Sequence, residues 1–196
     1  MTHKIAGFIA SMLQKSKVIE EDDSIFYQYG FEILIDTVLQ TILLLIIGIL
    51  LGKPMETLVF LIIFTLIRRY SGGYHANSKL KCTLVSTFVM LISIGLPIFF
   101  SNTISYIVGA VLAIITIWVF APVEHPNRPL TDNAIRHCCI YSRVLTVLTG
   151  IVILVLNIYK PEYAYTASLS LFSVAILIIV QRGENKNERT ESNEVS

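Results

Sequence analysis

Charged residues are scarce in this sequence. They make up 15% of its 196 residues, against about 25% in soluble domains, while hydrophobic residues make up 54% and the mean hydropathy is +0.69. The net charge of +1 lacks the excess of positive charge that is typical of proteins that bind nucleic acid. Three cysteines are too few for a disulfide framework, and the polar N-terminus lacks the apolar core of a cleavable signal peptide. These features predict an all-α integral membrane protein.

Long apolar runs fill most of the chain. A helix needs about 20 residues to cross a bilayer, with about 17 as a practical minimum. We expect six transmembrane helices, whose apolar cores are Ile33–Leu51, Met55–Ile67, Thr83–Phe100, Ile104–Phe120, Val144–Tyr159 and Tyr163–Val180. The second run is short, so it must borrow flanking residues such as Arg68 to Tyr70 or be re-entrant.

Two terminal segments complete the expected architecture. Residues 4–19 carry apolar side chains at helical spacing with lysines outside that stripe, which favours a helix lying in the membrane interface. An ordinary amphipathic helix packed on protein is the alternative. Residues 183–196 are polar without apolar periodicity, so we expect a disordered cytoplasmic tail after a single domain over residues 1–182.

The placement of Lys and Arg predicts the topology. Thirteen of the fifteen lie in the N-terminal segment, the stretch 68–82, the stretch 121–143 or the tail, and only Lys53 and Lys160 lie in turns on the other side. Positive residues concentrate on the cytoplasmic side of membrane proteins. Six crossings of the cell membrane with both termini in the cytoplasm satisfy this bias, and both long polar loops then face the cytoplasm.

One polar stretch, residues 68–82, stands between two apolar runs. It contains His75 and Cys82, the residue types that together make a thiolate nucleophile near neutral pH. Arg68 and Arg69 add positive potential, and Gly72-Gly73 gives the backbone freedom to fold back. That freedom matters because a straight helix would hold positions 75 and 82 about 10.5 Å apart along its axis.

Other readings of this stretch stay open. Cys82 could be a buried structural cysteine and His75 an interfacial histidine. Ser71 is a weaker candidate nucleophile, since His75 is its only nearby base. Glu32 and Asp36, four residues apart in the first span, could pair with the arginines, orient His75 or pair structurally elsewhere.

The second polar loop offers fewer signals. Thr131-Asp132-Asn133 is expected to begin a helix that carries His137, Cys138 and Cys139. Adjacent cysteines and the distance from His125 to His137 match no common metal site, so no metal and no cofactor is expected. Arg128 could contact an acidic substrate.

The sequence resembles the accessory gene regulator B (AgrB) family of membrane endopeptidases in Gram-positive quorum sensing. The resemblance is carried by Arg68, Gly72-Gly73, Tyr74, His75-Ala76 and Cys82, followed by Ala121-Pro122 and Arg128-Pro129-Leu130, and it covers nearly the whole chain. It implies that His75 and Cys82 form a catalytic dyad, that Arg68 and Gly73 support processing, and that the protein is a homodimer.

The resemblance also implies the reaction. Cys82 would cleave an AgrD-like precursor peptide on the C-terminal side of its future ring and hold the N-terminal part as a thioester, which a precursor Cys or Ser then closes to a thiolactone or lactone. The alternative function is a non-enzymatic membrane protein, such as a small transporter or a signalling partner, with a structural Cys82. A transporter should show polar residues or broken helices at the membrane midplane, whereas the third, fourth and sixth apolar cores contain no charge.

Overall fold

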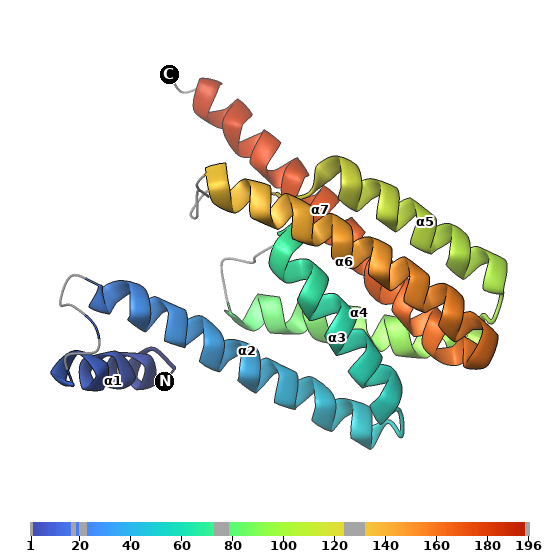
Figure 1. Cartoon of the computed structure of the whole chain (residues 1–196), viewed down its shortest axis with the longest axis horizontal. Helices are drawn as coiled ribbons and strands as arrows, with labels where there is room; N and C mark the ends of the chain where they lie inside the picture. Colours follow the sequence, from blue (N-terminus) through green and yellow to red (C-terminus); the bar gives the residue numbers. More distant parts are fainter. Residues whose placement is uncertain (1, 17–18, 20–22, 73–78, 124–131, 195–196) are drawn as a thin grey trace. The chain divides into compact units, whose positions relative to one another are not determined.

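The described part of the chain is built from helices. The computed structural model describes residues 2–16, 19, 23–72, 79–123 and 132–194 (Figure 1). It contains seven helices: α1 (Thr2–Lys15), α2 (Ser24–Leu50), α3 (Pro54–Ser71), α4 (Lys79–Phe99), α5 (Thr103–Phe120), α6 (Asp132–Tyr159) and α7 (Pro161–Glu194). The predicted all-α class is confirmed.

Five of these helices, α2, α4, α5, α6 and α7, are long and apolar enough to cross a membrane. The protein is therefore a multi-pass membrane protein. Helix α3 falls outside this group because Glu56, Arg68 and Arg69 interrupt its apolar composition. It corresponds to the short second run of the sequence, and the count of six crossings stays a prediction.

The chain divides into two compact units, residues 1–50 and 51–196. The single domain expected over residues 1–182 thus stays a prediction. In the first unit, α1 packs on α2 through small residues: Ala6 and Ala10 are buried, and Gly7 lies against the side chain of Gln28. Larger apolar side chains of α1, including Phe8 and Met12, stay exposed. An exposed apolar face of this kind is typical of a helix at the membrane interface.

In the second unit, α7 lies at the centre. It packs against α3, α4, α5 and α6, and α5 and α6 run alongside it (Figure 1). Small residues such as Ala167, Ser168 and Ser170 are buried along α7, and they allow close approach of neighbouring helices. The two serine hydroxyls donate to carbonyls one turn earlier in the same helix, Ala164 O at 2.9 Å and Thr166 O at 2.7 Å. Their polarity is thereby satisfied inside the bundle.

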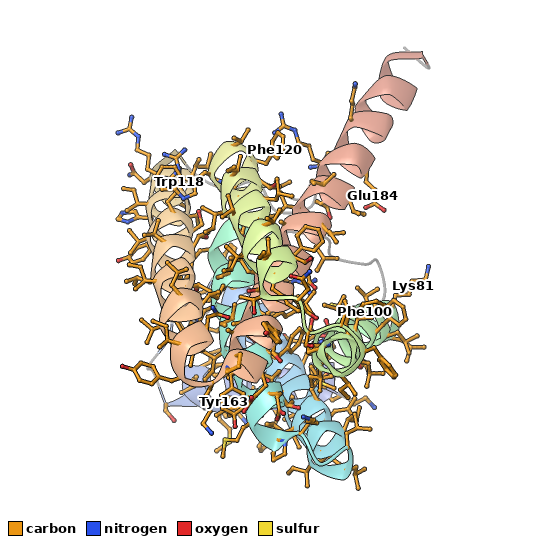
Figure 2. All side chains as sticks on the ribbon, turned by 90° about the vertical axis from the view of Figure 1, so that its right-hand side faces the viewer. Lys81, Phe100, Trp118, Phe120, Tyr163 and Glu184 are labelled. Atoms are coloured by element: carbon orange, nitrogen blue, oxygen red, sulfur yellow. The ribbon has the colours of Figure 1, made fainter. Side chains whose placement is uncertain are left out.

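Aromatic side chains lie at both ends of this unit. Figure 2 shows Trp118 and Phe120 at one end and Tyr163 toward the other. Near the turn between α4 and α5, the rings of Tyr106 and Tyr165 stack with centroids 4.4 Å apart, and the Tyr165 hydroxyl lies 2.8 Å from Thr103 Oγ1. The Tyr106 hydroxyl donates to the carbonyl of Phe100. These contacts fasten the start of α7 to the α4–α5 turn, away from the polar stretch at the end of α3.

Helix α7 extends further than the sequence indicated. It continues to Glu194, past the end of the apolar core at Val180, and the disordered tail expected over residues 183–196 stays a prediction. The Glu, Lys, Arg and Asn residues here tolerate a helix, and an already formed helix propagates at low cost compared with starting a new one. The start of α6 at Asp132 agrees with the predicted cap and places His137, Cys138 and Cys139 on that helix.

Candidate active site

Arg68 and Cys82 meet at the junction of α3 and α4. Arg68 lies in the last turns of α3, and Cys82 lies in the first turn of α4. The Arg68 Nη2 donates to Cys82 Sγ at 3.8 Å, and its Nη1 donates to Ser86 Oγ at 3.4 Å. Cys82 and Ser86 are four residues apart, so they share one face of α4. One guanidinium thus bridges two successive turns of the neighbouring helix.

The surroundings of Arg68 fix its head group. Its guanidinium carbon lies 5.3 Å from the centroid of the Phe64 ring, one turn earlier on α3, which is a cation–π contact. Ser86 is buried and Cys82 is half-buried. The adjacent Arg69, by contrast, is exposed. The structure therefore distinguishes the two adjacent arginines, which the sequence alone could not do. The Arg68 side chain points toward Cys82, and the Arg69 side chain is exposed.

Ser71 and Gly72 end α3 in a constrained geometry. Ser71 is buried, and its hydroxyl donates to Ile67 O at 2.8 Å. Gly72 has φ +73°, in the left-handed region that favours glycine. The Val123 N–H donates to Ser71 O at 3.0 Å, and Gly72 and Val123 form an isolated parallel bridge. The end of α3 is therefore paired with the chain that follows α5.

Three predicted site residues lie outside the described ranges: His75, Gly73 and Arg128. The His75–Cys82 dyad stays a prediction, and so do the roles of Gly73 and Arg128. Of the described candidates, the structure brings together Arg68 and Cys82 and places Gly72 one residue beyond the end of α3.

Glu32 and Asp36 belong to the first unit. Glu32 Oε2 lies 2.9 Å from His3 Nδ1, and the other ring nitrogen of His3 lies 3.3 Å from Gln28 Nε2. This contact ties α1 to α2, so it is a structural pairing of the kind left open for Glu32. The supporting roles of Glu32, Asp36 and Arg69 in a site stay predictions.

The start of α6 lies against α3. The rings of Tyr70 and Tyr141 stack with centroids 5.1 Å apart, and His137 stacks on Tyr141 at 6.4 Å. Cys138 and Cys139 are half-buried free thiols on the same helix. Among the residues that the structure describes, no group of three His, Cys, Asp or Glu side chains could hold a metal ion.

Sequence reasoning missed three residues of this neighbourhood: Phe64, Ser86 and Val123. Two of them carry a signal that helical spacing could have revealed. Phe64 precedes Arg68 by four residues, and Ser86 follows Cys82 by four. Val123 is 51 positions from Gly72, so its pairing is a tertiary contact without a local signature.

The fold and this junction define a multi-pass, all-helical membrane protein with a cysteine held against an arginine at the end of a candidate span. The family model described as Accessory gene regulator B matches residues 4–180, and the chain belongs to that family. The predicted resemblance is confirmed.

Relatives match over most of the chain. AgrB-like protein 2 of Clostridium perfringens (strain 13 / Type A) is 28% identical over 191 residues, covering 92% of this chain and 86% of the relative. An AgrB-like protein of Listeria monocytogenes serotype 4a (strain HCC23) is 29% identical over 142 residues, covering 69% and 68%. One from Lactiplantibacillus plantarum is 22% identical over 193 residues, covering 96% and 94%. No solved structure matches the chain.

Proposed function

We propose that this protein is a membrane cysteine endopeptidase that processes a quorum-sensing precursor peptide. Its family processes autoinducing peptides. The observation that carries the proposal for this chain is the contact between Arg68 Nη2 and Cys82 Sγ at 3.8 Å. A positive guanidinium beside a sulfur stabilises negative charge on it, and the thiolate is the nucleophilic form of cysteine.

The proposed first step is acyl transfer to the enzyme. The Cys82 thiolate attacks the scissile carbonyl and forms a C–S bond, and the C–N bond then breaks. His75 takes the thiol proton beforehand and gives a proton to the leaving amine. The C-terminal fragment leaves with a free amino group, and the N-terminal part stays on Cys82 as a thioester.

The second step closes the ring. A thiol or hydroxyl of the bound peptide attacks the thioester carbonyl, a new C–S or C–O bond forms, and the bond to Cys82 breaks. The proton of the attacking group passes to His75, and Cys82 is released in its starting form. The thioester keeps much of the reactivity of an acyl donor, so ring closure requires no nucleotide. Water competes for the same carbonyl, and a site at the membrane interface limits its access.

The described spans favour this enzyme over a transporter. A transporter is expected to have discontinuous helices with exposed backbone near the membrane midplane. Each of the five candidate spans is instead one continuous helix, and the buried hydroxyls of α7 donate within their own helix. The only cysteine on α4 is Cys82, at the end of the helix beside Arg68.

The test is a search for the acyl-enzyme by mass spectrometry. The substrate is a synthetic precursor with an amphipathic leader, a ring-forming Cys changed to Ala and an acidic tail, based on a short reading frame beside the gene. We expect a peptide adduct on Cys82 that hydroxylamine removes, as it removes thioesters. Cys82→Ala should give no cleavage and no adduct, while the matched control Cys139→Ala should give both. Efficient cleavage by Cys82→Ala would refute the proposal.

Membrane placement and assembly form separate parts of the proposal. We propose that both termini are cytoplasmic and that the protein acts as a homodimer. A reporter fused after Val180 should read as cytoplasmic, and cross-linking in membranes should trap a dimer. An extracytoplasmic reading would overturn the topology, and a fully active monomer in mild detergent would overturn the dimer.

A further inference from the structure

The side chains of Phe60, Phe64 and Arg68 form a row along α3. Successive members are four residues apart, so they lie on one face of the helix. The rings of Phe60 and Phe64 stack with centroids 4.9 Å apart, and the Arg68 guanidinium carbon lies 5.3 Å from the Phe64 centroid. The row therefore leads from the middle of α3 to the guanidinium that contacts Cys82.

The Phe64 ring is held firmly by its surroundings. Phe64 is 5% exposed and Phe60 is fully buried. Helix α3 packs against α4, α6 and α7, and close packing inside a bundle restricts the orientation of a buried ring. An aromatic ring carries negative charge density on its face, which attracts a cation. A ring of fixed orientation therefore gives the Arg68 guanidinium a preferred position.

Arg68 needs such contacts because its side chain is long. A free arginine side chain occupies many rotamers, and all but a few must be excluded if the guanidinium is to stay at one sulfur. Two of its contacts come from α4: Nη2 donates to Cys82 Sγ at 3.8 Å, and Nη1 donates to Ser86 Oγ at 3.4 Å. Phe64 adds a contact from the arginine's own helix, one turn earlier. The ring thus directs the guanidinium from α3 toward α4.

The same ring also affects how strongly the charge acts on the sulfur. The attraction between a guanidinium and a thiolate weakens as the local dielectric constant rises. The buried Phe64 ring covers one side of the Arg68 guanidinium and keeps water away from that side. The adjacent Arg69 is exposed, so solvent screens its charge. Phe64 therefore contributes both to the position of the Arg68 charge and to its strength at Cys82.

We propose that Phe64 is a positioning residue for the proposed acyl-transfer site: the face of its buried ring holds the Arg68 guanidinium against Cys82 Sγ. This inference rests on the proposed function, because it assumes that Cys82 is the nucleophile. Phe64 acts through Arg68 and does not touch the reacting atoms. Its chemistry differs from that of an ordinary core residue, since an aliphatic side chain of similar size would fill the space without attracting the cation.

The test removes the ring and measures the reactivity of Cys82. In the full-length protein in detergent, we measure the rate at which iodoacetamide alkylates Cys82 at pH 7. Phe64→Leu should slow alkylation about fivefold, and less than Arg68→Gln does, because Phe64 acts through Arg68. The matched control is Phe60→Leu, which loses an equally buried ring about 12 Å along α3 from Arg68. It should alkylate within twofold of the native rate, and equal slowing by both variants would overturn the proposal.

A fluorinated ring separates the attraction for the cation from packing. A trifluorinated phenylalanine at position 64 keeps the shape of the ring but loses the negative charge density on its face. It should slow Cys82 alkylation about threefold, whereas Phe64→Tyr keeps that face and should stay within twofold of the native rate. The same fluorinated residue at position 60 should have no effect. A native rate with the fluorinated ring at position 64 would mean that Phe64 only fills space, and would overturn the inference.

The pH profile and a double-mutant cycle distinguish positioning from general damage. At about pH 10 a thiol ionises without help, so the Phe64 variants and the native protein should alkylate Cys82 at similar rates. In an Arg68→Gln background, the fluorinated ring should slow alkylation less than twofold further, because the residue through which it acts is gone. Slowing that persists at high pH, or a full effect in that background, would overturn the inference. If Phe64→Leu also speeds alkylation of Cys138 and Cys139, the bundle is damaged and the fluorinated ring decides.

Failure of the proposed function looks different in these experiments. If the native protein forms no acyl adduct with the precursor while the fluorinated ring and Arg68→Gln remain non-additive in alkylation, the proposed peptidase reaction is wrong and the positioning of Arg68 by Phe64 stands. If the native protein forms the adduct and the fluorinated variant is alkylated and acylated at the native rates, the peptidase stands and the positioning role is wrong.

Discussion

Arg68 donates from Nη2 to the sulfur of Cys82, from the last turns of α3 to the first turn of α4. The Arg68 side chain is half-buried between the Phe64 ring and Ser86, so its position does not depend on a bound substrate. A fixed charge beside a nucleophile requires no reorganisation when the reaction begins. This arrangement argues for a role at the sulfur, in addition to any binding of an acidic substrate tail, for which the five fixed donors of an arginine are suited.

The hydrogen bond that Arg68 donates to Ser86 predicts a role for that serine. Ser86→Ala removes the oxygen that accepts from Arg68 Nη1 at 3.4 Å, and we expect Cys82 alkylation to slow about threefold, because one of the contacts that orient the guanidinium is lost. The matched control is Ser93→Ala, since Ser93 is also buried on α4 but its hydroxyl donates to Val89 O at 2.9 Å within the helix. Equal alkylation rates in the two variants would contradict this role.

The packing of α1 on α2 predicts which face of α1 meets lipid. Ala6 and Ala10 are buried, whereas Phe8 and Met12 are exposed. A single tryptophan can report depth after Trp118→Phe. We expect Phe8→Trp in that background to be strongly quenched by brominated lipid, and Lys4→Trp to be quenched much less, since an interfacial helix buries only its apolar face. Weak quenching at both positions would show that α1 packs on protein instead.

Much of the fold was predictable because apolar runs of this length have few alternatives to helices in a membrane. The starts of α5 and α6 follow local rules, as Asn102 accepts from the Ile104 N–H at 3.0 Å and α6 begins at Asp132. The length of α7 was not predictable, because composition alone does not determine whether a charged segment continues a helix already formed. Helix α3 is ambiguous for a related reason: Arg68, in its polar C-terminal end, contacts Cys82 and Ser86 of α4.

The candidate site was predictable only in part. Arg68 and Cys82 could be selected from residue type and resemblance, since a positive charge near a cysteine stabilises the thiolate. The separation of Arg68 from Arg69 required the helix orientation, which places the half-buried Arg68 side chain against α4 and leaves Arg69 exposed. The pairing of Gly72 with Val123 depends on how α5 ends against α3, and no local sequence rule encodes that distance.

The contacts at the far end of the bundle predict a stability effect without an activity effect. Tyr165→Phe keeps the ring that stacks on Tyr106 but loses the hydroxyl 2.8 Å from Thr103 Oγ1. We expect a loss of about 1 kcal/mol in the free energy of unfolding, the usual contribution of one hydrogen bond. Denaturant unfolding in detergent measures it. Cys82 alkylation should stay native, and a slowed rate would reveal coupling across the bundle.

The last prediction concerns what Arg68 does. Arg68→Gln removes the charge beside Cys82 Sγ, and we expect about tenfold slower alkylation because the thiolate loses the positive group that contacts it. Arg68→Lys keeps a charge but loses the planar fork that reaches both Cys82 and Ser86, so an intermediate rate is expected. Arg143→Gln is the control, since Arg143 contacts Trp118 on α5.

Substrate kinetics then separate the two roles. A guanidinium that stabilises the sulfur should affect acylation at saturating peptide, so Arg68→Gln should lower kcat and slow alkylation in parallel. A guanidinium that binds the acidic tail of the precursor should instead raise KM, leave alkylation at the native rate and lose its effect when the tail is neutralised. The 3.8 Å contact favours the first result. Native alkylation by Arg68→Gln together with a raised KM would assign Arg68 to substrate binding alone.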